Sequence, residues 1–173
     1  NIFRTKKQMM VFHAAAGLGI PILNSQSLPF EKSFYLGGSN SMRAWRLRTL
    51  GPGGYIDTSA STFVIENVGD IKLELNLEYR FKIYKVLNAA LFVDAGNVWL
   101  LRSNKEFPNG EFVFNRFYKE IAIDAGIGIR LDLSFFVLRL DYALKIHNPA
   151  LAGNQSWQHF NWKSYKDFRN DRA

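Results

Sequence analysis

The stretch I-K-L-E-L-N-L-E-Y-R-F-K-I, residues 71–83, decides the fold. Its odd-numbered positions are all apolar or aromatic, and its even-numbered positions are all polar or charged. Because successive side chains of a strand point to opposite faces, this pattern predicts a β-strand with one apolar and one polar face. At about 3.3 Å per residue the strand would span roughly 40 Å, whereas globular strands usually have about 5–6 residues.

The same alternation recurs along the chain. Further strands are expected near residues 9–20, 88–99, 120–133 and 136–146. No stretch shows the 3.6-residue period of an amphipathic helix, so the sequence predicts an all-β chain of about five strands. The longest apolar runs have only a few residues, whereas a transmembrane helix needs about 20.

The connections between these strands alternate in length. Residues 21–70 form a long connection, residues 84–87 a short one, residues 100–119 a long one, and the turn near residues 134–135 is tight; a long polar segment, residues 147–173, follows. Short periplasmic turns and long outer loops are typical of outer-membrane β-barrels.

Two kinds of sheet fit the alternation. In a soluble sheet the polar face meets water, whereas in a membrane barrel the apolar face meets lipid and the polar face lines the lumen. Strand length, the segregated loop lengths and an aromatic residue at a strand end, Trp99, favour the membrane barrel. Five strands cannot close around a polar interior. We therefore expect residues 1–173 to be the C-terminal portion of one barrel domain, truncated at both ends.

The composition excludes several kinds of chemistry. The chain has 173 residues and no cysteine, which excludes disulfides, cysteine-ligated zinc, iron–sulfur clusters and a thiol nucleophile. The three histidines lack metal-ligand spacing, and neither a G-x-S-x-G elbow nor a phosphate-binding glycine loop is present. We therefore expect no enzyme activity, no cofactor and no metal site.

The net charge of +7 raises the question of nucleic-acid binding. The basic residues are spread along the chain, and several alternate with acids on one strand face, as Lys72, Glu74, Glu78 and Arg80 do. A lumen of mixed charge explains this pattern better, so we do not expect a nucleic-acid partner.

The long connection contains an unusual segment, E-K-S-F-Y-L-G-G-S-N-S-M-R-A-W-R-L-R-T-L-G-P-G-G, residues 31–54. It is too rich in aromatic and apolar residues for disorder, and loops of such length are usually functional when ordered.

This segment resembles the large sixth outer loop of the BamA/TamA outer-membrane assembly family, whose V-R-G-F/Y tetrapeptide would correspond to residues 42–45. Three later motifs, in the family's order, strengthen the resemblance: G-D and L-E-Y-R-F (69–81), L-F-V-D-A-G-N-V-W (91–99), and G-I-G-I-R-L-D with L-R-L-D-Y (126–142). The loop-motif residues are Gly37, Gly38, Met42, Ala44, Trp45, Gly51, Pro52 and Gly53, and the strand-motif residues are Phe92, Gly96 and Val98.

The resemblance implies a sixteen-stranded barrel that follows periplasmic POTRA repeats, with this chain similar to strands eleven to fifteen. The loop and its sequel look most like TamA-like members of Bacteroidota. The family's last strand should end in an aromatic residue, whereas this chain ends in Asp171-Arg172-Ala173, so the closing strand is expected to be absent.

The resemblance also implies a role for Arg43. In this family the loop folds into the lumen, and its Arg is held by an acid on each of the next two strands. The matching acids are Glu78 and Asp94, and the alternation independently puts Glu78 on the polar face. Ala44 departs from the usual Gly, which suggests a different turn at the loop tip. Gly96 is expected to leave space for the loop, together with Gly126 and Gly128.

The implied function is the folding, insertion or translocation of β-barrel proteins in the bacterial outer membrane, without covalent catalysis. The implied partners are outer-membrane lipids and lipopolysaccharide, unfolded outer-membrane proteins, and accessory outer-membrane or periplasmic subunits. One alternative is a secretion pore of the same superfamily that passes a partner protein. An alternative of another class is a soluble β-sheet binding module.

Overall fold

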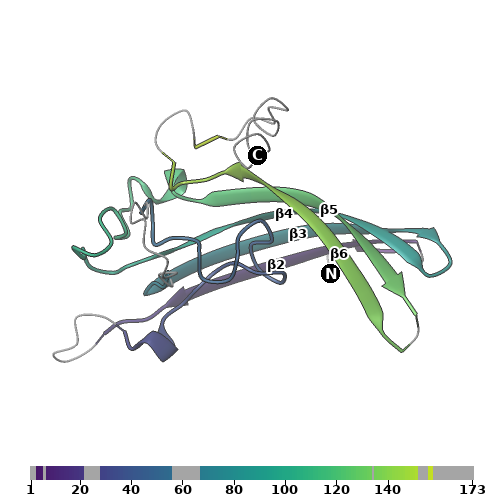
Figure 1. Cartoon of the computed structure of the whole chain (residues 1–173), viewed down its shortest axis with the longest axis horizontal. Helices are drawn as coiled ribbons and strands as arrows, with labels where there is room; N and C mark the ends of the chain where they lie inside the picture. Colours follow the sequence, from purple (N-terminus) through teal and green to yellow (C-terminus); the bar gives the residue numbers. More distant parts are fainter. Residues whose placement is uncertain are drawn as a thin grey trace, which may run out of the picture.

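A computed structural model describes residues 3–5, 7–21, 28–55, 67–133, 135–151 and 156–157. These residues form one antiparallel sheet in which each strand pairs with its neighbours in the sequence (Figure 1). The strands are β1 (Phe3–Arg4), β2 (Gln8–Leu18), β3 (Ile71–Tyr84), β4 (Leu87–Trp99), β5 (Ala122–Asp132) and β6 (Val137–His147). Two 3₁₀ turns, η1 (Phe30–Lys32) and η2 (Phe117–Lys119), lie in the long connections.

The all-β fold class is therefore confirmed. Two details differ from expectation. The short strand β1 could not be predicted from alternation, because it has only two residues. The second strand ends at Leu18 rather than near residue 20. Within the part of the chain that the structure describes, no helix is long and apolar enough to cross a membrane.

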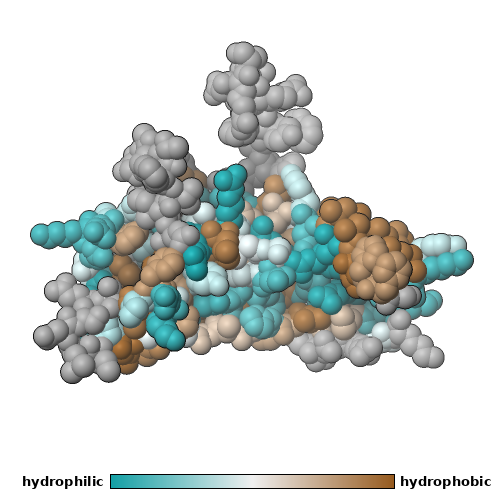
Figure 2. Space-filling model, turned by 60° about the horizontal axis from the view of Figure 1, so that its bottom comes forward, coloured by the Kyte–Doolittle hydropathy of each residue, from teal (hydrophilic) through white to brown (hydrophobic). Residues whose placement is uncertain are grey.

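The register places the apolar positions on one side of the sheet, which we call the outer face. Leu77 lies opposite both Phe12 and Val93, and Ile127 lies opposite both Leu91 and Tyr142. These side chains are exposed, with 50% of Leu91 and 59% of Ile127 accessible. Figure 2 shows apolar side chains gathered at the end where β5 turns into β6. An exposed apolar face of this extent is suited to lipid.

The opposite side, the inner face, is polar and largely covered. Glu74, Glu78, Asp94 and Asp124 on this face are all buried. They are buried because residues 28–55, which we call the lumen loop, lie across the curved sheet (Figure 1). The main apolar core lies between this loop and the sheet: Leu36, Met42, Trp45 and Leu50 from the loop, with Val98 and Ala122 from β4 and β5.

The connections are segregated by length. The β2–β3 and β4–β5 connections lie at one end of the sheet, and the short β3–β4 and β5–β6 turns lie at the other (Figure 1). At the end with the long connections, Trp99 is fully buried against Phe112 and Phe117, and its Nε1 donates to Glu120 Oε2 at 2.7 Å. Trp99 therefore packs inside the β4–β5 connection, so its place at the strand end serves the packing of that connection.

Candidate functional site

The lumen loop presents Arg43 between two buried anchors. Gly37 and Gly38 adopt positive φ values of 104° and 89°, and the Gly38 N–H donates to the Trp45 carbonyl at 2.8 Å. A side chain at Gly37 would collide with the carbonyl of Arg46, so this turn requires glycine. Met42 and Trp45 enter the apolar core on either side of Arg43. The loop therefore fixes the backbone from which the Arg43 side chain extends.

The guanidinium of Arg43 joins two strands. Its Nε and Nη2 donate to the two carboxylate oxygens of Asp94 at 2.8 and 3.0 Å, and its Nη1 donates to Glu78 Oε2 at 2.7 Å. The side chains of Arg43 and Glu78 are only 7% and 8% exposed. The structure thus brings together the three residues that the sequence singled out, in the bidentate geometry that suits an arginine fork.

The strand register explains why one guanidinium reaches both acids. Glu78 lies opposite Phe92, and Asn76 lies opposite Asp94. Glu78 and Asp94 are therefore diagonal neighbours on the inner face of β3 and β4, a separation that long side chains can span. Asn76 Nδ2 completes the arrangement by donating to Asp94 Oδ1 at 3.0 Å and to the Ser41 carbonyl at 2.9 Å.

Phe92 forms the floor of the site. The guanidinium carbon of Arg43 lies 3.6 Å from the centre of the Phe92 ring, a cation–π contact. Phe92 is itself buried and lies against Gly126, where an added Cβ would collide with the ring. Of the glycines expected to leave space for the loop, Gly96 does so beside Leu36. Gly126 instead leaves space for Phe92, and Gly128 for Arg130 and Asp141, so that part of the expectation is wrong.

Charges on the inner face extend the ion pairs beyond Arg43. Glu78 Oε1 accepts from Arg80 Nε at 2.6 Å and from Arg130 Nη2 at 3.0 Å. Arg130 also donates to Asp141 at 2.5 Å. Burial disfavours the charge of Arg43, but hydrogen bonds and the charges of Asp94 and Glu78 outweigh it and raise the pKa of its guanidinium. Arg43 therefore remains charged at any physiological pH.

The loop tip also contacts the next two strands. The Ala44 N–H donates to Asp124 Oδ2 on β5 at 3.2 Å, and Asp124 lies opposite Asp94. On β6, Arg139 Nη2 donates to the Ser39 carbonyl and to Asn40 Oδ1. The backbone of Ala44 does not have positive φ, so alanine is compatible with this turn. That the tip turns differently from the usual Gly-containing loop stays a prediction.

A second segment of the loop covers the end of β4. Gly51 and Gly53 have positive φ values of 82° and 53°, and Pro52 between them is fully buried. The Gly53 N–H donates to the carbonyl of Val98, and Asn97 Nδ2 donates to the carbonyl of Gly53 at 2.9 Å. This segment fixes the loop at the strand end, away from Arg43.

Sequence reasoning missed several members of the site. Asn76, Asp124, Arg130 and Arg139 all lie on the inner face and contact the loop or its ion pairs. Their positions on the polar side of alternating strands were the available signal, but the partner of each depends on the register. In the described part of the chain, no group of three metal-ligating side chains is placed to hold a metal.

The apolar outer face, the polar inner face and the inserted loop define a piece of an outer-membrane β-barrel wall. A family model described as the Omp85 superfamily domain matches residues 1–163, and the chain belongs to this superfamily of outer-membrane β-barrel proteins. Its members assemble or translocate proteins. Membership places the chain in the outer membrane and decides against a soluble sheet.

The fold is similar to a solved structure, "The crystal structure of BamA from Haemophilus ducreyi lacking POTRA domains 1-3". The TM-score is 0.61 at 20% sequence identity, over 81% of this chain. The chain spans 28% of that structure, so it corresponds to part of the solved barrel protein. No curated protein matches the sequence.

Proposed function

We propose that this chain is part of an outer-membrane assembly factor of the BamA/TamA type, which folds and inserts other β-barrel proteins. Membership of the Omp85 superfamily and the BamA-like fold support this proposal. The observation that carries it is the buried fork of Arg43, which ties the lumen loop to acids on two successive strands. The proposed activity needs no covalent chemistry, cofactor or metal.

In this proposal Arg43, Glu78 and Asp94 act as the anchor of the lumen loop. The anchor joins β3 and β4 through one planar cation, so it fixes both the loop and the relative position of the two strands. Removal of one partner would leave buried charge without compensation, at a cost of about 3–5 kcal/mol. An assembly factor needs a wall that stays intact while substrate strands pair elsewhere in the barrel, and the anchor would supply that rigidity.

The proposed partners are unfolded outer-membrane proteins, accessory subunits, and the lipids and lipopolysaccharide around the outer face. Exposed apolar side chains along β5 and β6, among them Ile127 and Leu140, support the lipid contact. The relationship to TamA-like proteins of Bacteroidota stays a prediction.

The test uses the full-length protein reconstituted in lipid vesicles with an unfolded barrel protein as substrate. Arg43→Ala should reduce the rate of substrate insertion at least tenfold. Arg46→Ala is the matched control, because Arg46 is exposed on the same loop. Unchanged insertion by Arg43→Ala would contradict the anchor. Passage of a soluble partner through the wild-type lumen, without insertion of barrel substrates, would instead establish the secretion pore.

A further inference from the structure

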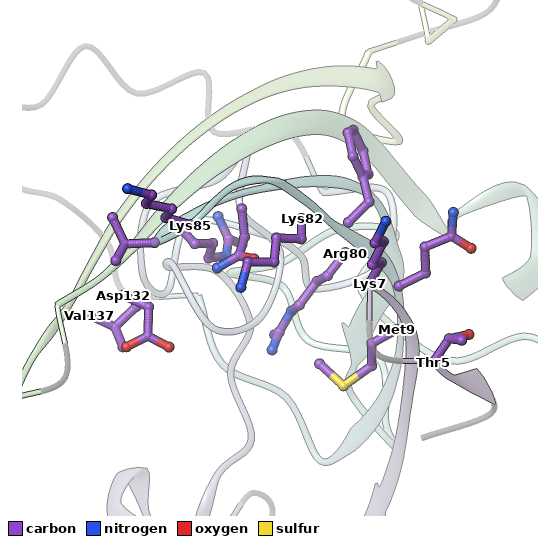
Figure 3. A pocket seen from close by; sticks show the side chains of 13 residues that line it. Thr5, Lys7, Met9, Arg80, Lys82, Lys85, Asp132 and Val137 are labelled. Atoms are coloured by element: carbon purple, nitrogen blue, oxygen red, sulfur yellow. The ribbon is translucent and has the colours of Figure 1, made fainter.

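A second feature of the inner face lies at the end with the short turns. Side chains from β2 to β6, and from residues that flank these strands, surround a hollow of about 620 Å³ beneath the curved sheet (Figure 3). Its lining contains five basic side chains, Lys7, Arg80, Lys82, Lys85 and Arg130, against one acid, Asp132. The side chains that line the hollow therefore carry a net positive charge.

The register brings these charges together from distant parts of the sequence. The Lys82 N–H donates to the carbonyl of Lys7 at 2.9 Å, which sets Lys82 of β3 beside Lys7, the residue just before β2. Lys82 lies opposite Asn88, and Asn88 lies opposite Arg130. Lys85 follows in the β3–β4 turn. A row of cations thus crosses the inner face next to the short turns.

The arginines and lysines of this hollow differ in what they already bind. Arg80 and Arg130 are held by Glu78, and Arg130 also by Asp141. Among the residues that the structure describes, no carboxylate forms an ion pair with Lys7, Lys82 or Lys85. All three lysines are exposed. The charges available to a ligand are therefore flexible ammonium groups rather than fixed guanidinium forks.

This chemistry identifies the kind of ligand. Guanidinium forks suit planar anions in one fixed geometry, whereas flexible ammonium groups act as point charges that can follow anions spaced irregularly along an extended chain, such as a run of carboxylates. The hollow faces the lumen, away from the lipid-facing side chains. Its volume is that of a small-ligand pocket, which admits a short extended stretch of polypeptide and not a folded domain.

We propose that this hollow binds an acidic, extended stretch of an unfolded client polypeptide as it enters the lumen. The short turns mark the periplasmic end in barrels of this kind, so the hollow lies at the entrance. The proposal rests on the proposed assembly function for the identity of the client, but its carrying observation, the unpaired lysines, is separate from the anchor at Arg43.

The test measures binding directly in the full-length protein in detergent micelles. The probe is a fluorescein-labelled peptide of alternating Glu and Ser, followed by fluorescence anisotropy. The variant Lys7→Gln/Lys82→Gln/Lys85→Gln should weaken binding about tenfold, since exposed charge pairs contribute a few-fold each. Lys105→Gln/Lys119→Gln is the control, because both lysines are exposed on the β4–β5 connection. Binding should also weaken steeply with salt.

Three results of the competition and variant measurements would overturn the proposal. The first is a triple variant that binds the peptide as tightly as wild type does. The second is a control variant whose binding weakens as much as that of the triple variant. The third is displacement of the peptide by glycerol phosphate at the same concentration of charge, which would identify a lipid headgroup as the ligand. Insertion assays on the same proteins distinguish failure of the binding site from failure of the proposed function. If wild type inserts substrates normally but does not bind the peptide, the site is overturned and the assembly role stays intact.

Discussion

The guanidinium of Arg43 stacks on the ring of Phe92 at 3.6 Å while its edge is bound by Asp94 and Glu78. The cation is therefore enclosed by two kinds of partner, carboxylates at its edge and a π-face below. Hydrogen bonds fix the direction of the guanidinium in its plane, and the ring fixes its height above the sheet.

Replacement of the ring should weaken the loop without removing its ion pairs. Phe92→Leu keeps an apolar floor but removes the π-face, and we expect a loss of about 1–2 kcal/mol in loop docking. Hydrogen exchange of residues 38–48 in the full-length protein measures this loss as faster exchange. Phe12→Leu is the control, because Phe12 lies on the outer face. Equal exchange in the two variants would contradict the contribution of the ring.

A lysine at position 43 should make the loop sensitive to alkali. The hydrogen bonds and charges of Asp94 and Glu78 raise the pKa of Arg43 above its ordinary value, so the stabilisation that its charge provides is present throughout the physiological range and is lost only in strong alkali. Lysine has an ordinary pKa of about 10.4 and cannot form the bidentate fork. In Arg43→Lys, loop docking should therefore weaken as the pH rises above about 10.4, whereas wild type should not change over the same range.

Spin labelling can measure this difference. A nitroxide on Leu47→Cys, an exposed position of the lumen loop, reports loop mobility at each pH. The expected signal is a mobile component that grows with pH in Arg43→Lys alone. Identical pH profiles for the two proteins would show that the charge at position 43 does not hold the loop.

Exchange of the charges should partly restore the anchor. Asp94→Arg places a second cation beside Arg43 and should abolish loop docking, at a cost of about 3–5 kcal/mol. Arg43→Asp in the same chain should recover part of the insertion activity. Recovery should be incomplete, because Asn76 Nδ2 donates to the Asp94 carboxylate and an arginine cannot accept that bond. Equal activity of the single and double variants would argue against direct pairing.

Gly126 offers a test from the far side of Phe92. A Cβ at this position would collide with the Phe92 ring and with the carbonyl of Tyr142, so Gly126→Ala should lower the unfolding temperature and speed exchange in the lumen loop. In combination with Phe92→Leu, the cost to the loop should be less than the sum of the two single costs, because both act through the same ring. Strict additivity would contradict this coupling.

Much of the fold was accessible from the sequence because strand alternation is a local property. The pattern of residues 71–83 predicts both the strand and which side chains lie on its apolar and polar faces. The structure extends that strand by one residue, to Tyr84. The stretch at 88–99 alternates less cleanly, and Phe92 is one reason. An aromatic residue occupies a position on the inner face there, where it supports Arg43. The pattern is interrupted where the site needs an exception.

The partners of the site depended on information that no local pattern contains. Asp124 meets the loop because β5 pairs with β4 in one particular register, and Arg139 reaches Asn40 across 99 residues of sequence. The resemblance supplied Glu78 and Asp94 as partners of Arg43, but it gave no indication of Asn76 or Arg139. The burial of Trp99 against Phe112 and Phe117 could not be predicted either, because the fold of the β4–β5 connection has no repeating pattern.

The apolar cluster between the lumen loop and the sheet has a consequence for how such a ring could be built. Leu36, Met42 and Trp45 fill the hollow side of the bent sheet and contact β4 and β5 directly. The loop therefore acts as a solid support around which the strands curve. The bend is a property of this arc itself, so the arc would hold its curvature before the two ends of the ring meet.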